Sequence, residues 1–150
     1  LDVLAVLLDV VLLTLFGTAL SSAVNFHLST NGQASAVGTV VSAGYGFICG
    51  AYMPVSAFST GLQRVISFLP GTYGTGLLRN HCLAGALREM EKVGIPKETV
   101  EEIKNSIDCN LYFFGNKVSQ GAMYLILAGA TLLLLGVYIL FYTIERKKKK

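Results

Sequence analysis

Charged residues are scarce in this 150-residue sequence, where Asp, Glu, Lys and Arg make up 14% of the chain against about 25% in ordinary soluble domains. They are absent from Val10 to Gln63 and again from Val118 to Ile144. Each of these charge-free runs is longer than the ~20 residues that cross a bilayer as a helix. The composition therefore argues against a soluble enzyme and predicts an integral membrane protein.

Signatures of catalysis and of cofactor binding are also missing. His27 and His81, the two histidines, lie far apart in the sequence, and no zinc-binding pattern surrounds them. Gly71–Gly76 is rich in glycine but lacks the Gly-Lys-Ser/Thr ending of a phosphate-binding loop. We therefore expect no cofactor in this chain and no enzymatic activity of its own. Nucleic-acid binding is not expected either, because the basic residues gather in Arg146–Lys150 and are not spread over a folded face.

The sequence opens at Leu1 and enters an apolar run at once, with no basic segment before it. A secretory signal peptide would carry such a segment. We expect these residues to be the C-terminal part of a longer membrane protein, so any function inferred here is a function of that larger protein.

Three transmembrane helices are predicted, at about residues 3–26, 34–53 and 120–142, which makes the chain an all-α, multi-pass protein of the cell membrane. The second is rich in small residues that let helices approach closely in lipid, and Pro54 ends it. The basic tail follows the third and is expected in the cytoplasm by the positive-inside rule. Residues 55–117 are then external, and the short connection 27–33 is cytoplasmic.

A re-entrant or interfacial pair of helices is predicted over residues 55–87. Val55–Leu69 repeats apolar residues with the period of a helix but is too short and too one-sided to span. Pro70 is expected to break this helix, and Gly71–Gly76 to form a flexible bend into a second short helix at Leu77–Leu87. Broken helices at membrane depth have to pack against other spans or line a cavity.

Residues 88–117 are the charged part of the chain and are predicted to form a small external helical insert. Gly94 is typical of a helix end and Pro96 of a helix start, so a helical hairpin is expected. Cys82 and Cys109 both fall in the external region and would be able to pair in an oxidising compartment. The sequence leaves this disulfide open, because it does not give the Cα separation that the bond requires.

Two charged residues have two interpretations each. Asp9 is the one carboxylate inside a predicted span, where an aspartate costs roughly 2.5–3.5 kcal/mol on the insertion scale. It either faces a wet, functional interior or lies near the outer headgroups. Arg64, on the polar face of the 55–69 segment, either extends to the headgroups or lines an outer gate.

Four short stretches occur in order, at Gly46–Ser56, Leu62–Val65, Leu69–Pro70 and Leu77–Arg79. Together they resemble the ABC-2 type permease family of ATP-binding-cassette exporters. In that family the fifth transmembrane helix ends in a Gly-x-Tyr-x-Pro-like turn, two short re-entrant helices follow, and a sixth helix returns to the cytoplasm. The resemblance implies that the three predicted spans are the fourth, fifth and sixth helices of a six-helix permease. The insert at 88–117 is longer than the matching segment of many members.

The resemblance also implies partners, namely a cytoplasmic ATP-binding-cassette ATPase subunit, a second permease half in a homo- or heterodimer, and the lipid bilayer. The chain would form part of the translocation pathway and of its outer gate, while ATP is hydrolysed in the partner subunit. The candidate translocation and gate residues are Asp9, Gly50, Pro54, Gln63, Arg64, Pro70 and Arg79. The alternative is a non-transporting scaffold or assembly protein, which would have no need of broken helices at the outer leaflet.

Overall fold

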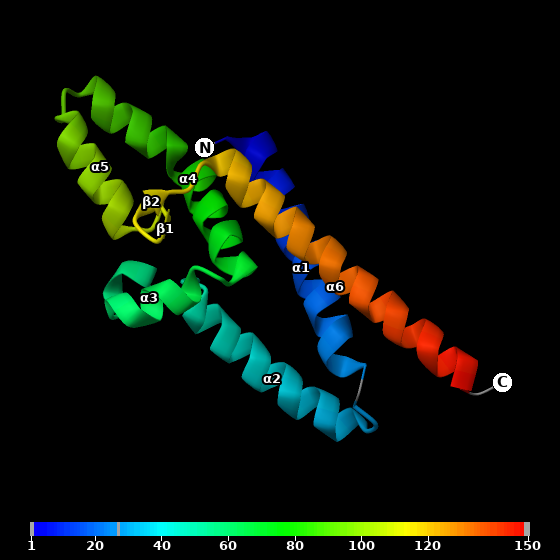
Figure 1. Cartoon of the computed structure of the whole chain (residues 1–150). Helices are drawn as coiled ribbons and strands as arrows, with labels where there is room; N and C mark the ends of the chain where they lie inside the picture. The colour runs from blue at the N-terminus through cyan, green and yellow to red at the C-terminus, as the bar shows by residue number, and fades with distance from the viewer. Residues whose placement is uncertain (1, 27, 149–150) are drawn as a thin grey trace.

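The chain folds almost entirely into helices (Figure 1). A computed structural model describes residues 2–26 and 28–148, so His27 and the last two residues of the basic tail lie outside the described residues. Within that part the helices are α1 (Val3–Asn25), α2 (Asn31–Ile48), α3 (Thr60–Ile66), α4 (Pro70–Lys92), α5 (Lys97–Ser106) and α6 (Gln120–Lys148), with a 3₁₀ turn η1 (Val55–Ala57) and strands β1 (Tyr112–Phe113) and β2 (Asn116–Lys117). The predicted all-α class is confirmed.

α1 and residues 120–144 of α6 are, among the described helices, the two that are long and apolar enough to cross a membrane. Only 17% of the apolar window of α1 and 11% of that of α6 are buried inside the protein. A core helix of a soluble protein would be mostly buried, whereas these two present leucine and valine side chains outward. Their surfaces suit a hydrocarbon surrounding.

α1 and α6 lie side by side and run in the same direction (Figure 1). Near their first turns, the Tyr124 hydroxyl of α6 donates a 2.6 Å hydrogen bond to Asp9 of α1. Near their far ends, the ring centroid of Phe26 lies 5.7 Å from that of Tyr138 and 5.8 Å from that of Phe141. Contacts at both ends therefore fix the parallel pairing.

α2 is shorter than the span predicted at residues 34–53. The Thr30 hydroxyl caps its start by accepting a 3.2 Å hydrogen bond from the Gln33 N–H. The chain leaves the helix at Gly50, whose φ of +80° is a left-handed conformation that glycine adopts readily, so the predicted end at Pro54 is wrong by several residues. α2 is not among the helices apolar enough to span, because its first turn is polar. None of its residues is buried.

The predicted helix over residues 55–69 and the predicted bend at 71–76 are both wrong. In the structure the first of these segments is η1 followed by α3, which has only seven residues, and α4 runs unbroken over 23 residues from Pro70. Pro70 lies in the first turn of α4, where a missing N–H has no helical partner to lose. Proline therefore starts this helix instead of breaking one.

The glycines at the start of α4 serve close packing. A Cβ on Gly74 would lie 2.4 Å from Leu13 Cδ2 of α1 and 3.3 Å from Leu127 Cδ2 of α6. The first turns of α4 are thus wedged between the two apolar helices. Beside this contact, the buried apolar cluster consists of Tyr73, Leu77, Leu111 and Met123.

The C-terminal half of α4 and α5 form the helical hairpin predicted for the insert, although the predicted boundary at residue 88 falls inside α4. The turn between them contains Gly94, with φ +88°. Leu87, Val100 and Cys109 form the buried cluster that closes the hairpin.

No strand is predicted at the end of the insert, yet Tyr112 pairs with Lys117 and Phe113 with Asn116. The connecting Phe114 and Gly115 have φ values of +49° and +86°, as a two-residue type I′ turn requires. Phenylalanine is an unusual residue for a positive φ, so the sequence does not signal this turn. The hairpin leads directly into the start of α6.

Replacing Gly74 with leucine tests the wedge. The new side chain would overlap Leu13 and Leu127, and overpacking of this kind typically costs about 1–3 kcal/mol. We expect the thermal unfolding midpoint of the full-length protein in nanodiscs to fall by several degrees. Gly129→Leu on the exposed side of α6 is the matched control, because nothing lies within 4 Å of a Cβ there. Equal midpoints for the two variants would contradict the wedge.

Candidate functional site

Asp9 of α1 is a buried carboxylate, with 1% of its surface exposed. Its Oδ2 lies 2.6 Å from Nδ1 of His81 on α4, and its Oδ1 accepts a 2.6 Å hydrogen bond from the hydroxyl of Tyr124 on α6. The rings of His81 and Tyr124 are stacked, with centroids 6.3 Å apart. These three residues, named here the Asp9 triad, join the three packed helices at one point.

The triad satisfies the carboxylate without a cationic side chain of lysine or arginine. When Asp9 is ionised it only accepts hydrogen bonds, so in that state His81 donates through Nδ1–H and Tyr124 through its O–H. Hydrogen bonds to both oxygens offset part of the cost of burying the charge. Asp9 is therefore enclosed by protein and not exposed to headgroups, while the functional role predicted for it stays a prediction.

A second polar cluster is built on Arg79, which is on another face of α4. Its Nη1 lies 3.1 Å from Asp108 Oδ2, and its Nη2 donates to the carbonyl of Gly50 at the end of α2. The Asp108 carboxylate also accepts the backbone N–H groups of Val55 and, at 3.2 Å, Ser56. These five residues are named here the Arg79 lock, because they tie α4 to the end of α2, to η1 and to the chain after α5.

Gly50 and Pro54, both predicted gate residues, belong to the turn that the lock holds. A Cβ on Gly50 would lie 2.9 Å from Val55 Cγ2, so glycine is needed for this close contact as well as for the positive φ. The carbonyl of Pro54 accepts a 3.0 Å hydrogen bond from the Ala57 N–H and so begins η1. Gly50 is therefore in contact with Arg79, and Pro54 belongs to the same turn.

The other predicted residues lie around this turn or away from it. Gln63 of α3 donates through Nε2 to the carbonyls of Phe58 (2.7 Å) and Ser56 (3.3 Å), which connects α3 to the lock. Pro70 begins α4. The Arg64 side chain is exposed and makes none of the described hydrogen bonds or ion pairs. Its two interpretations therefore stay open.

The candidate disulfide between Cys82 and Cys109 is not formed, and both residues are free thiols. Cys109 is buried against Leu87, and its carbonyl accepts a hydrogen bond from the Asn80 side chain, so one face of α4 points toward it. Cys82 follows Asn80 by two positions, or about 200° around the helix, which turns its exposed side chain away.

His81, Tyr124 and Asp108 are the site residues that the sequence analysis does not identify. A signal exists for His81, because the predicted topology puts the outer end of the first span and the helix at 77–87 on the same side of the membrane. A buried aspartate needs a donor, and His81 is one of the donors on that helix. Asp108 has no such signal, because its role depends on a left-handed backbone conformation with φ +55°.

Glu101 connects α5 to the hairpin before α6. It accepts hydrogen bonds from Asn110 Nδ2 (2.8 Å), Lys117 Nζ (3.2 Å) and Lys104 Nζ (3.4 Å). These bonds lower the pKa of the Glu101 carboxyl below its ordinary value, and the bond from Asn110 has the largest effect. The network is half-exposed, so its contribution to stability is screened by solvent.

Removing the charge of Asp108 tests the lock. Asp108→Asn keeps a residue that tolerates positive φ but leaves Arg79 unpaired in a mostly buried place, which costs about 3 kcal/mol. We expect faster amide hydrogen exchange over residues 50–58 of the full-length protein, measured by mass spectrometry. Arg64→Gln, which removes an exposed cation, should leave the exchange of that segment unchanged. Unchanged exchange in Asp108→Asn would show that the lock does not hold the turn.

The Glu101 network predicts a specific pH dependence. A carboxyl whose folded pKa is below its unfolded pKa contributes stability above the unfolded pKa and loses it as the pH falls through the folded pKa. The midpoint difference between the wild type and Glu101→Gln should therefore shrink steadily on acidification. Glu102→Gln, next to it on the exposed side of α5 and outside this network, is the matched control. A difference that stays constant with pH would contradict the assignment.

No family model matches the chain, and no curated protein or solved structure is significantly similar to it. Among the described residues, no group of three or more His, Cys, Asp or Glu side chains is placed to hold a metal ion. The features of the molecule that bear on its function are therefore the Asp9 triad, the Arg79 lock and the helices that position them.

Proposed function

We propose that this chain is the C-terminal part of a membrane permease subunit of an ATP-driven exporter of the ABC-2 type. The observation that supports it best is the start of α4, which lies between α1 and α6 at the level of Leu13 and Leu127. Leu13 is about 15 Å along α1 from its first residue at 1.5 Å per residue. A helix that begins at this depth, preceded by the short α3, is what a re-entrant pair requires.

The polar groups at this helix start are satisfied within the protein. The Gly71 N–H donates to the Tyr45 hydroxyl of α2 (3.2 Å), and the Thr72 hydroxyl donates to the Ile66 carbonyl (3.2 Å). The Tyr73 hydroxyl donates to the Ser67 carbonyl (2.5 Å). Irregular backbone at membrane depth needs such internal partners, so these bonds favour a membrane position for α3 and the start of α4.

The proposal includes α2 as a third span. Its 18 residues rise about 27 Å, close to the ~30 Å of a hydrocarbon core. None of its residues is buried, so its small-residue surface is available to further helices. We assign those helices to the rest of the subunit and to a second permease half, and ATP hydrolysis to a cytoplasmic ATPase partner.

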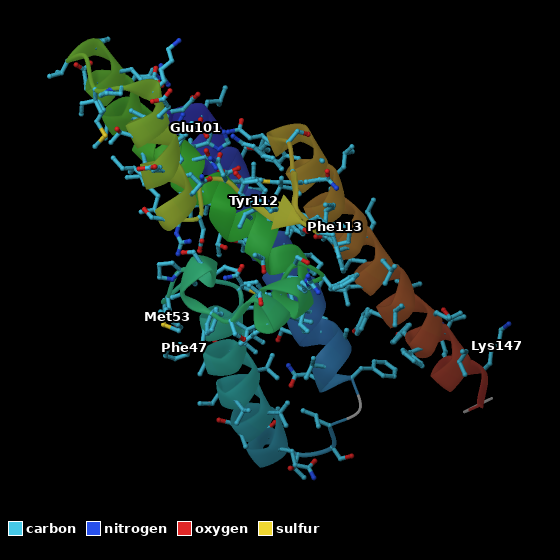
Figure 2. The ribbon with its side chains drawn as sticks, turned by 60° about the vertical axis from the view of Figure 1, so that its left-hand side comes forward. Phe47, Met53, Glu101, Tyr112, Phe113 and Lys147 are labelled. Atoms are coloured by element: carbon cyan, nitrogen blue, oxygen red, sulfur yellow. The ribbon has the colours of Figure 1, made fainter. Side chains whose placement is uncertain are left out.

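The proposed orientation puts the basic tail in the cytoplasm and the insert outside the cell membrane. Glu101 of the insert and Lys147 of the tail lie at opposite ends of the molecule (Figure 2). The positive-inside rule then assigns the Lys147 end to the cytoplasm. Phe47, in the last turn of α2, and Met53, in the turn that follows it (Figure 2), mark the outer end of that helix, where Gly50 joins the Arg79 lock. In this orientation the lock and α3 form the outer gate.

A reversible cross-link between α2 and α4 tests whether this gate works in export. A Cβ on Gly71 would lie 3.0 Å from Cys49 Sγ, about the separation of a Cβ from the partner sulfur in a disulfide with an S–S bond of ~2.05 Å. Gly71→Cys in the full-length subunit, reconstituted with its ATPase partner, should lose ATP-driven export on oxidation and regain it on reduction. Gly71→Cys with Cys49→Ser should not respond to oxidation.

The Tyr45 ring has to shift to admit the new side chain, because the same Cβ would lie 2.6 Å from its Cε1. Export by the reduced variant is therefore measured first. If that variant is inactive, Thr75→Cys, whose side chain lies beside the Cys49 carbonyl, takes its place. Full export by the completely cross-linked protein would contradict a gate that opens between α2 and α4. A reconstituted wild type that does not export at all would favour the scaffold alternative.

A further inference from the structure

We propose that Asp9 and His81 form a proton-binding site that opens to the external aqueous side and makes the protein sensitive to external pH. This inference depends on the proposed membrane orientation. It starts from the burial of the pair, since the side chain of Asp9 is fully enclosed while that of His81 keeps 12% of its surface exposed. His81 is therefore the member of the pair that water reaches.

The access route is a cavity of about 310 Å³ between the outer ends of α1, α4, α5 and α6. His81 lines it, together with Asp2, Asn80, Ala84, Leu87, Arg88, Glu91, Lys104 and Gln120. His81 Nδ1 is hydrogen-bonded to Asp9, and the Nε2 of His81 has no hydrogen-bond partner among the described residues. One histidine ring thus connects the buried carboxylate to an open, polar cavity.

The charges around the site favour a proton over other ligands. The cavity has two acids, Asp2 and Glu91, and two bases, Arg88 and Lys104, so it does not select strongly for anions or cations. On the buried side, both oxygens of Asp9 already accept hydrogen bonds from His81 and Tyr124. A metal cation would have to displace these donors, whereas a proton needs only the free nitrogen of His81.

The step is a simple proton uptake. Without the proton, neutral His81 donates through Nδ1–H to ionised Asp9, and the triad has a charge of −1. A hydronium ion in the cavity gives its proton to Nε2 and leaves as water, which makes the triad neutral overall. If the Nδ1 proton then moves along the 2.6 Å contact to Asp9 Oδ2, His81 and Asp9 are both neutral. Either form removes the net charge, which costs less in a buried place.

The site also has a mechanical consequence, because its three members come from α1, α4 and α6. Proton uptake changes the charge of a polar contact that joins all three helices near their outer ends. The Asp2 N–H donates to the His81 carbonyl (3.1 Å), so the start of α1 is also bonded directly to His81. External acidification should therefore bias how the outer ends of the three helices pack, and with it the rate of export.

Infrared difference spectroscopy tests the proposal on the full-length protein with its ATPase partner in oriented proteoliposomes. The pH at the external face is changed between about 8 and about 5, the range in which histidine titrates. We expect bands of protonated imidazole or of a protonated carboxylic acid that disappear in Asp9→Asn and in His81→Gln. Cys82→Ser, at the neighbouring exposed residue, should keep them. The same pH change at the internal face should not produce them.

ATP-driven export is measured in parallel as a function of external pH. We expect the wild type and Cys82→Ser to share a pH dependence that His81→Gln loses. Wild-type spectra without such bands, bands that persist in both triad variants, or bands produced from the internal face would each overturn the proposal. Proton uptake is read without transport, so uptake in a protein that does not export would leave the site in place and refute the proposed function alone.

Discussion

The close approach of α4 to α1 and α6 at Gly74 is the contact on which the other features depend. It sets the depth and the rotation of α4 between two helices whose outer surfaces are apolar. His81 is seven positions after Gly74, two turns along on the same face, so it also meets α1 and contacts Asp9. Arg79 is five positions after Gly74 and lies on another face, where it meets Asp108. One glycine contact therefore positions both polar clusters.

The two clusters differ in the chemistry that holds them. The Arg79 lock pairs a guanidinium, which stays charged, with a carboxylate that also accepts backbone N–H groups, so it joins several segments through a cation that does not depend on pH. The Asp9 triad uses a histidine and a phenol, and the charge of histidine changes within the physiological range. The lock suits a connection that holds the outer turn in this conformation at any physiological pH, and the triad suits a contact whose strength varies with pH.

The parts of the fold that depend on composition and period could be predicted from the sequence. These are the two long apolar helices, the helical hairpin of the insert and the polar turn after α1. The continuous α4 could not, because glycine and proline signal a bend in isolation, and only the tight contact at Gly74 shows that they permit packing. The partners of Asp9 depend on the rotation of α4, and the turn at Phe114 depends on a backbone conformation that phenylalanine rarely adopts.

The parallel pairing of α1 and α6 restricts the number of times that the chain between them can cross the membrane. On the proposed orientation, α1 ends on the cytoplasmic side and α6 begins on the external side. The segment between them, which includes α2 to α5, therefore has to change sides an odd number of times. α3 and α4 enter and leave the membrane on the external side, so together they contribute an even number of crossings. On this proposal the single remaining crossing belongs to α2, whose polar first turn and glycine-rich surface would then need other helices as neighbours in the bilayer.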